Sequence, residues 1–181
     1  MMDRREFATQ SIMKTLLSTC IAIIVTVNLA YSANPKDLPD GFTTLNVGDQ
    51  APGFTLPGTN GKTYSLEDFS DHDILVIYFT GTHCPTSHGA MGRMLQFVED
   101  FSNESFGFVA INPNHSSGLR PDEFGHTDYD ETFEESQRYA EDYGWTFPFL
   151  YDGDQQLTAR AYGCLATPHV LIFDKDRRLR Y

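Results

Sequence analysis

The chain has 181 residues, which suits one domain or two small ones, and its 40% hydrophobic and 13% aromatic residues are enough to form a core. Its 13 Lys and Arg residues against 25 Asp and Glu residues give a net charge of −12, which argues against binding to nucleic acid or to an anionic membrane surface. The 3 cysteines are too few for a disulfide scaffold and lack the paired spacing of a structural zinc site.

Residues 1–33 have the parts of an export signal. Two basic residues, Arg4 and Arg5, lie near the start, an apolar run covers residues 16–30, and small residues follow. The arginine pair resembles a twin-arginine signal, so we expect export, with the periplasm as the destination. The run is shorter than the roughly 20 residues that span a bilayer. We therefore predict cleavage after Ser32 or the next residue and no stable membrane association afterwards, with an uncleaved anchor or a disordered tail as the alternatives.

A single domain, residues 34–181, would remain after cleavage. It keeps Cys84 and Cys164, whereas Cys20 would be lost with the signal. Export to an oxidising compartment makes a disulfide between the two remaining cysteines chemically permissible.

The first half of this domain begins with short extended pieces over residues 45–69, where Asn60-Gly61 is a hairpin-type turn signal. Residues 74–79 form a continuous apolar run, which is typical of a strand buried on both faces. A helix is predicted over residues 87–101. Its apolar face contains Met91, Met94, Leu95 and Val98.

The second half continues the alternation of strands and helices. We predict strands at 106–112, 147–152 and 170–173, helices at 132–143 and 155–162, and a polar loop at 113–130. This order indicates an α/β fold whose parallel strands are joined by right-handed crossovers. His115 and His126 on the loop are expected to be solvated. The acidic residues around the first of these helices are also expected to form a solvated face: Glu131, Glu134, Glu135, Glu141 and Asp142.

Cys84 lies where the first buried strand meets the first long helix. Pro85 suits the first helical position, which places Cys84 near the N-cap. Unpaired N–H groups and the helix dipole there lower a thiol pKa from about 8.5 toward roughly 3.5–7.5, and His83 and His88 could add to this shift. Thiolate is the reactive form, so the position favours a nucleophile. The alternative is a buried cysteine that acts as a small hydrophobic residue.

The segment Thr167-Pro168 precedes the last predicted strand. A proline is permitted at the first residue of a strand, and an X-Pro bond in a tight turn can also be cis. The sequence leaves both conformations open.

Several stretches resemble the redoxins of the thioredoxin superfamily, in the alkyl hydroperoxide reductase and thiol-specific antioxidant group. They cover residues 47–56, 61–62, 65–69, 151–152, 161–163 and 173–176, with Cys84-Pro85-Thr86 between them. The resemblance implies a thioredoxin-like fold: a central mixed sheet flanked by helices, with an N-terminal hairpin extension. It also implies that Cys84 is the nucleophile and that Pro168 belongs to a cis-proline loop in contact with substrate. Nothing in the pattern calls for a cofactor or a metal.

The chain departs from that pattern at the usual second cysteine. Ser87 occupies the position of the second thioredoxin cysteine, and Gly81 lies where related proteins carry a cysteine or the peroxiredoxin threonine. Thr82 is a nearby candidate for that threonine. Cys164 could resolve an oxidised Cys84 by forming a disulfide, or it could simply pack behind the proline loop.

The sequence therefore predicts a thiol-dependent oxidoreductase that reduces a peroxide or a disulfide and is regenerated by Cys164 or an external thiol. One alternative is a redox-inactive interaction domain on the same fold. Another is a copper or zinc module built from His83, Cys84, His88 and His169. Because redoxins continue beyond residue 181 with a further strand and helix, we also expect either a truncated C-terminus or a trimmed fold.

Overall fold

The computed structural model of the protein describes residues 38–102, 105–119 and 127–181. The predicted export signal and His126 lie outside these residues. All the helices and strands described below belong to the compact unit Asp40–Tyr181.

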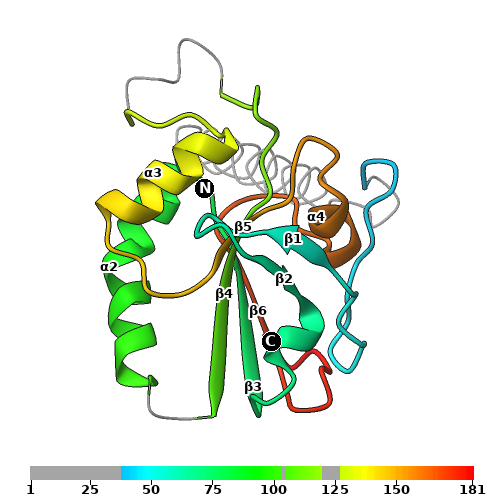
Figure 1. The fold of residues 1–181 in the computed structure, drawn as a ribbon. Coiled ribbons are helices and arrows are strands. Elements are labelled where there is room, and N and C mark those ends of the chain that lie inside the picture. Colours follow the sequence, from blue (N-terminus) through cyan, green and yellow to red (C-terminus); the bar gives the residue numbers. More distant parts are fainter. Residues whose placement is uncertain (1–37, 103–104, 120–126) are drawn as a thin grey trace, which may run out of the picture. The chain divides into compact units, whose positions relative to one another are not determined.

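A four-stranded mixed sheet forms the centre of this unit (Figure 1). Its strands are β3 (Ile74–Phe79), β4 (Phe106–Asn112), β5 (Phe149–Tyr151) and β6 (His169–Phe173), in the order β5-β4-β3-β6. Strand β4 is parallel to both β3 and β5, whereas β6 is antiparallel to β3. Strands β3 and β4 have the predicted bounds, 74–79 and 106–112, and the mixed sheet that the resemblance implied is confirmed.

Both faces of the central strands are buried, as the continuous apolar run predicted. Alternate residues of β3 enter two separate clusters, with Ile77 on one face and Val76 on the other. This alternation follows from the two-residue period of a strand. The sheet is therefore covered by other elements on each side.

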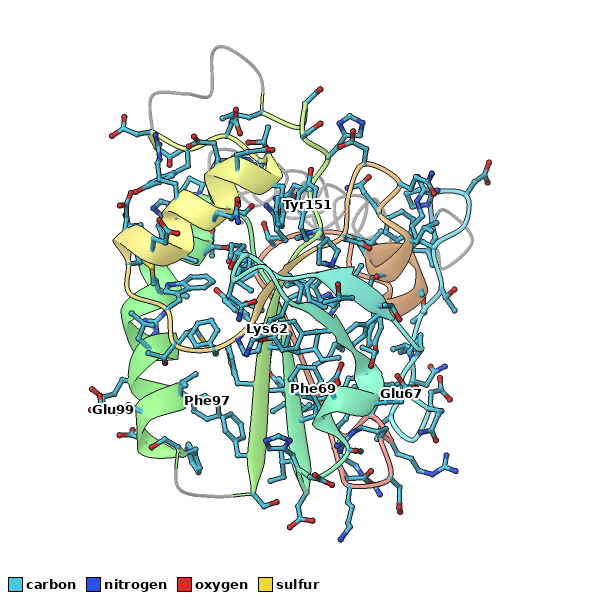
Figure 2. The ribbon with its side chains drawn as sticks, in the orientation of Figure 1. Lys62, Glu67, Phe69, Phe97, Glu99 and Tyr151 are labelled. Atoms are coloured by element: carbon cyan, nitrogen blue, oxygen red, sulfur yellow. The ribbon has the colours of Figure 1, made fainter. Side chains whose placement is uncertain are left out.

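Two helices cover the face of Val76. They are α2 (Pro85–Asp100) and α3 (Phe133–Asp142), and they contribute Met91, Met94, Phe97, Val98, Tyr139 and Ala140 to that cluster. Figure 2 shows Phe97 directed toward the sheet and Glu99 directed away from it. None of the helices in the described part of the chain has both the length and the hydropathy that a membrane span requires.

The opposite face is covered by α4 (Leu157–Tyr162) and by an N-terminal hairpin. The hairpin pairs β1 (Thr55–Pro57) with β2 (Thr63–Ser65), and its turn contains Gly61 with a φ of 79°. The short 3-10 helix η1 (Leu66–Phe69) follows and buries Phe69. This arrangement confirms the predicted hairpin extension and its turn.

The helix ends follow from local capping. The Thr132 hydroxyl accepts from the Glu135 N–H at 3.2 Å, so Thr132, the first residue of the predicted helix, is the N-cap and α3 begins at the next residue. The predicted helix at 155–162 begins two residues later, at Leu157, because Asp152 accepts from Thr158 N–H at 2.9 Å and Ala159 N–H at 2.7 Å.

Candidate functional site

Cys84 is the N-cap residue of α2, directly after the loop that leaves β3. Its backbone is extended, with φ −67° and ψ 115°, and Pro85 is the first helical residue. The thiol is partly buried and donates to the Thr167 carbonyl oxygen, with an Sγ–O distance of 3.3 Å. The predicted N-cap position is confirmed, because proline both starts the helix and leaves no N–H of its own to satisfy.

The surroundings of Cys84 lower the pKa of its thiol. Burial raises this pKa, but the nearby polar side chains of Thr167 and Ser87, together with the N–H groups of Ser87 and Thr86, lower it by more than burial raises it. A lowered pKa increases the fraction of thiolate at neutral pH. The site therefore has the electrostatic property that a nucleophilic cysteine needs.

The Thr167-Pro168 segment lies against this cysteine. Its peptide bond is cis, and β6 begins at the next residue, His169. The Thr167 carbonyl accepts from the Cys84 thiol, and Pro168 remains partly exposed. The structure thus brings together two of the predicted site residues, Cys84 and Pro168, from segments that are far apart in the sequence.

Cys164 is a buried thiol in the core cluster, with 5% of its surface exposed. Its Sγ lies 3.6 Å from the Ala166 carbonyl oxygen, and burial raises its pKa to about 12. Both cysteines within the described residues are free thiols. A resolving role for Cys164 remains a prediction, since in this conformation the thiol is protonated and shielded.

Thr82 is completely buried, and its hydroxyl donates to the Asp130 carbonyl at 2.6 Å. Its own carbonyl is 2.6 Å from the His88 ring nitrogen Nε2 and also accepts from the Thr127 hydroxyl at 3.3 Å. These contacts hold the loop before Cys84 against the segment before α3. The proposed catalytic role of Thr82 stays a prediction, because its hydroxyl proton is already donated to a backbone carbonyl oxygen.

Glu131 is the main site residue that the sequence analysis missed. We predicted that it would be part of a solvated acidic face, and this is wrong: its exposed fraction is 0%. It accepts from the His83 backbone N–H at 3.0 Å, and it is also hydrogen-bonded and ion-paired to the His83 ring. Glu131 precedes α3, so the helical pattern of acidic residues did not apply to it. A glutamate at a helix entry carries no local signal of burial.

The pKa of Glu131 is low despite this burial. Desolvation raises it, but the His83 side chain, the His83 N–H and the Asn114 amide lower it further than burial raises it. Glu131 is therefore a buried carboxylate that keeps its charge at neutral pH, next to the residue that precedes the nucleophile.

Gly81 explains how this carboxylate fits. A Cβ atom at this position would overlap with the Asn114 Nδ2 atom and would lie 2.8 Å from Glu131 Oε1. The space that a cysteine or threonine side chain at residue 81 needs is therefore filled by Asn114 and Glu131. The departure from the redoxin pattern at Gly81 is thus matched by two polar side chains from elsewhere in the chain.

The histidines near Cys84 have protein partners. The His83 ring is paired with Glu131, and the His88 ring contacts the Thr82 carbonyl. Across residues 38–102, 105–119 and 127–181, no three His, Cys, Asp or Glu side chains are placed to hold a metal ion. The copper or zinc alternative has no supporting cluster in this part of the chain.

The chain matches known proteins over most of its length. The AhpC/TSA family matches residues 47–181. A protein named "Putative peroxiredoxin" from Mycobacterium tuberculosis (strain ATCC 25618 / H37Rv) is 31% identical over 123 residues, which are 67% of this chain and 68% of that protein. "Thiol-disulfide oxidoreductase ResA" from Geobacillus thermodenitrificans (strain NG80-2) is 22% identical over 167 residues, 92% of this chain and 85% of that protein.

Solved structures share the fold. A hypothetical protein from Sinorhizobium meliloti 1021 superposes with a TM-score of 0.67 at 30% identity, covering 77% of this chain and 70% of its own. A structure titled "putative Thiol:disulfide interchange protein DsbE" from Chlorobium tepidum has a TM-score of 0.59 at 21% identity, covering 75% of this chain and 82% of its own. The thioredoxin-like fold is therefore shown, and with the match over residues 47–181 the chain belongs to the AhpC/TSA family.

Proposed function

We propose that this protein is a thiol-dependent oxidoreductase in which the Cys84 thiolate reduces a peroxide or a disulfide. The observation that carries the proposal is the position of Cys84 at the N-terminus of α2, where hydrogen bonds lower its pKa despite burial. The names of two relatives, a peroxiredoxin and a thiol-disulfide oxidoreductase, support the same chemistry.

The reaction with a peroxide would begin with attack of the Cys84 sulfur on one peroxide oxygen. An S–O bond forms, the O–O bond breaks, and the departing oxygen takes a proton to leave as water or an alcohol. The product is a sulfenic acid on Cys84. With a disulfide, an S–S bond forms instead and a thiolate leaves, which gives a mixed disulfide.

Regeneration of Cys84 is proposed to come from an external thiol. Cys164 is buried and its pKa is raised to about 12, so it supplies little thiolate in the folded protein. One external thiol would attack the sulfenic acid, expelling water and forming a mixed disulfide. A second external thiol would then attack this disulfide, so that Cys84 leaves as a thiolate and the two external thiols end as a disulfide. A resolving role for Cys164 would need its loop to open.

The proposal can be tested on the protein and on two variants, Cys84→Ser and Cys164→Ser. Each is treated with one equivalent of hydrogen peroxide or of a small disulfide, after which the thiols are counted and the oxidised residue is identified by mass spectrometry. We expect oxidation at Cys84 and not at Cys164, and no oxidation of Cys164 in Cys84→Ser; Cys20, in the predicted signal, is followed as a separate peptide. Loss of both thiols together would instead assign Cys164 as the resolving residue. An inert Cys84 with an ordinary pKa would leave a redox-inactive interaction domain.

We also propose that residues 1–33 direct export to the periplasm by the twin-arginine route. The support is the pair Arg4-Arg5 ahead of an apolar run. Replacing both arginines by lysine keeps the charge and removes the pair. We expect this variant to accumulate in the cytoplasm on fractionation of a bacterial host, and equal export of both forms would contradict the proposal.

A further inference from the structure

Two hydroxyl groups close to Cys84 are buried without a well-aligned hydrogen-bond partner. Tyr78 is 3% exposed and Ser87 is 2% exposed. Neither the Tyr78 Oη nor the Ser87 Oγ has an aligned hydrogen bond to another described residue. Buried polar groups are nearly always paired, so two neighbouring exceptions behind a reactive sulfur call for an explanation.

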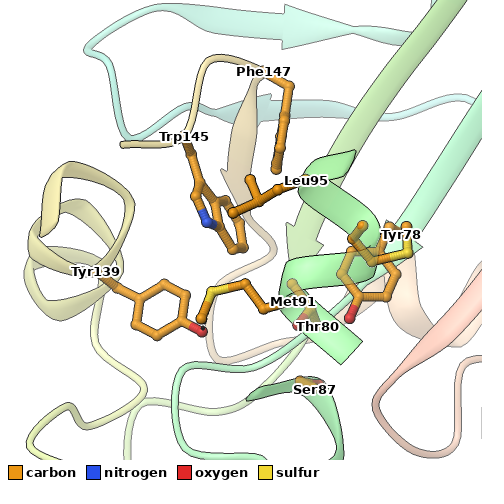
Figure 3. A pocket seen from close by; sticks show the side chains of 9 residues that line it. Tyr78, Thr80, Ser87, Met91, Leu95, Tyr139, Trp145 and Phe147 are labelled. Atoms are coloured by element: carbon orange, nitrogen blue, oxygen red, sulfur yellow. Dashed lines mark hydrogen bonds between the residues drawn. The ribbon is translucent and has the colours of Figure 1, made fainter. Parts of the chain in front are cut away.

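Both hydroxyls lie on the face of the sheet that α2 and α3 cover. Ser87 is in the first turn of α2, three residues after Cys84, so its side chain is on the same face as the thiol. Tyr78 lies in β3 and packs in the cluster beneath α2. Together with Thr80 they line a cavity of about 10 Å³, which Figure 3 shows between α2 and the sheet.

The three groups also affect one another electrostatically. The Ser87 side chain lowers the pKa of Cys84, and the same hydroxyl acts on Tyr78. Burial raises the pKa of Tyr78, the Thr80 and Ser87 hydroxyls lower it, and negative charge on Cys84 raises it again. The thiol and the two hydroxyls therefore lie within range of each other's charge.

We propose that Tyr78 and Ser87 form a hydrogen-bond relay that stabilises the Cys84 thiolate. The Ser87 hydroxyl donates to Cys84 Sγ, and the Tyr78 hydroxyl donates to Ser87 Oγ. This inference rests on the proposed function, because it concerns the same thiolate. Ser87 is a catalytic residue in this scheme since it touches the reacting sulfur, whereas Tyr78 is a positioning residue.

The number of protons fixes the direction of the relay. In the thiol state Cys84 donates its proton to the Thr167 carbonyl oxygen, and the neutral sulfur is only a weak hydrogen-bond acceptor for Ser87. When that proton is lost to solvent, the sulfur becomes an acceptor. Ser87 can then donate its single proton to the sulfur and accept the single proton of Tyr78. The two hydroxyls are thus placed for a charge that develops only when Cys84 ionises.

This relay gives the site a donor where a dithiol redoxin would have its second cysteine. Serine stabilises the thiolate and forms no disulfide with it. Cys84 is thus activated without an internal partner at position 87 that could be oxidised, which agrees with regeneration by an external thiol.

The test measures the pKa of Cys84 from the pH dependence of its alkylation in the full-length chain, followed on the Cys84 peptide by mass spectrometry so that Cys20 and Cys164 do not contribute. The variants are Ser87→Ala, Tyr78→Phe and the double variant, with Ser87→Thr to restore a hydroxyl. Tyr139→Phe is the matched control, because Tyr139 lines the same cavity but directs its hydroxyl to Met91 Sδ at 3.4 Å. Folding is checked by circular dichroism and by the fluorescence emission of Trp145, the chain's single tryptophan.

We expect Ser87→Ala to raise the pKa by about one unit, a shift that corresponds to loss of a hydrogen bond to a charged group. Tyr78→Phe should raise it by about half a unit, roughly a threefold loss of thiolate. The double variant should match Ser87→Ala alone, since Tyr78 acts only through Ser87. In Ser87→Thr the pKa of Cys84 should return most of the way to the parent value, and in Tyr139→Phe this pKa should equal that of the parent.

An unchanged pKa in Ser87→Ala would overturn the relay, and this holds even when Tyr78→Phe does not fold. A Tyr78→Phe shift that persists in the Ser87→Ala background would overturn it as well. In both cases the parent protein still shows a reactive Cys84 with a low pKa, so the proposed function stands. If the parent itself has an ordinary pKa and resists both oxidants, the proposed function fails and the relay fails with it.

Discussion

Glu131 holds His83 by two separate contacts. Its buried carboxylate accepts from the His83 N–H at 3.0 Å and also pairs with the His83 ring. The two residues are 48 positions apart, so the contacts connect the segment before α3 to the loop that carries Cys84. A charge in the interior is tolerated only when it is paired and hydrogen-bonded. The loop before the nucleophile is therefore held by a charged group.

Loss of the Glu131 charge should destabilise the protein. We expect Glu131→Gln to reduce the free energy of unfolding by about 2 kcal/mol, because it removes a charged acceptor from the His83 N–H and from the partly exposed His83 ring. Urea denaturation at neutral pH measures this change. Glu134→Gln, an exposed glutamate in the first turn of α3, is the control and should change stability by less than about 0.5 kcal/mol. Equal effects of the two substitutions would contradict the assignment.

Because of the Glu131 carboxylate, the free energy of unfolding should depend on pH in the acidic range. The pKa of Glu131 in the folded protein is lower than its ordinary value of 4.5 because of its contacts with His83 and Asn114. Its contribution is therefore complete above that ordinary pKa and is lost as the pH falls through the lower folded value. We expect the difference in unfolding free energy between the parent and Glu131→Gln to shrink across this acidic range. A difference that stays constant with pH would show that Glu131 is not ionised in the folded state.

A methyl group at residue 81 should disturb the site. In Gly81→Ala the new Cβ would overlap with Asn114 and press on Glu131, so we expect a loss of about 1–3 kcal/mol and slower alkylation of Cys84. Gly92→Ala is the matched control. Gly92 lies in α2 with nothing within 4 Å of an added Cβ, so this change should stabilise the protein by about 0.5–1 kcal/mol. The expected changes in the urea midpoint thus have opposite signs.

The two thiols of the described residues, Cys84 and Cys164, should differ widely in reactivity. Cys84 has a lowered pKa, whereas that of Cys164 is raised to about 12 and the residue is buried. At neutral pH we expect iodoacetamide to label Cys84 at least about 100-fold faster than Cys164, which should react only after denaturation. Peptide mass spectrometry of the native and unfolded protein measures both rates. Comparable labelling in the native state would mean that the loop of Cys164 opens readily.

The Thr167 hydroxyl should contribute to the low pKa of Cys84. We expect Thr167→Ala to raise this pKa by about half a unit to one unit, because it removes a donor to the thiolate. Thr86→Ala provides the comparison, since Thr86 acts through its backbone N–H, which alanine keeps. Alkylation rates between about pH 5 and pH 9 define both pKa values, and equal shifts in the two variants would rule out a specific role for the Thr167 hydroxyl.

Much of the fold could be predicted from local patterns. The apolar runs at 74–79 and 106–112 are strands with those bounds, because residues buried on both faces leave a signal within a few positions. The N-cap position of Cys84 was readable for a similar reason: Pro85 has a fixed φ and starts a helix wherever it fits. Turn and cap residues such as Gly61 and Thr132 also act on their immediate neighbours.

The rest of the site depends on contacts between segments that are distant in the chain. The acidic residues around Glu131 in the sequence indicated a solvated face. Only the packing of its segment against the Cys84 loop buries Glu131 beside His83. Burial and hydrogen bonding set a pKa, and both are properties of the three-dimensional surroundings rather than of a residue's neighbours in sequence. The sequence by itself therefore determined which thiol begins a helix. The tertiary structure decided that Cys164 is shielded, that Glu131 is charged inside the protein, and that Tyr78 and Ser87 line the same cavity.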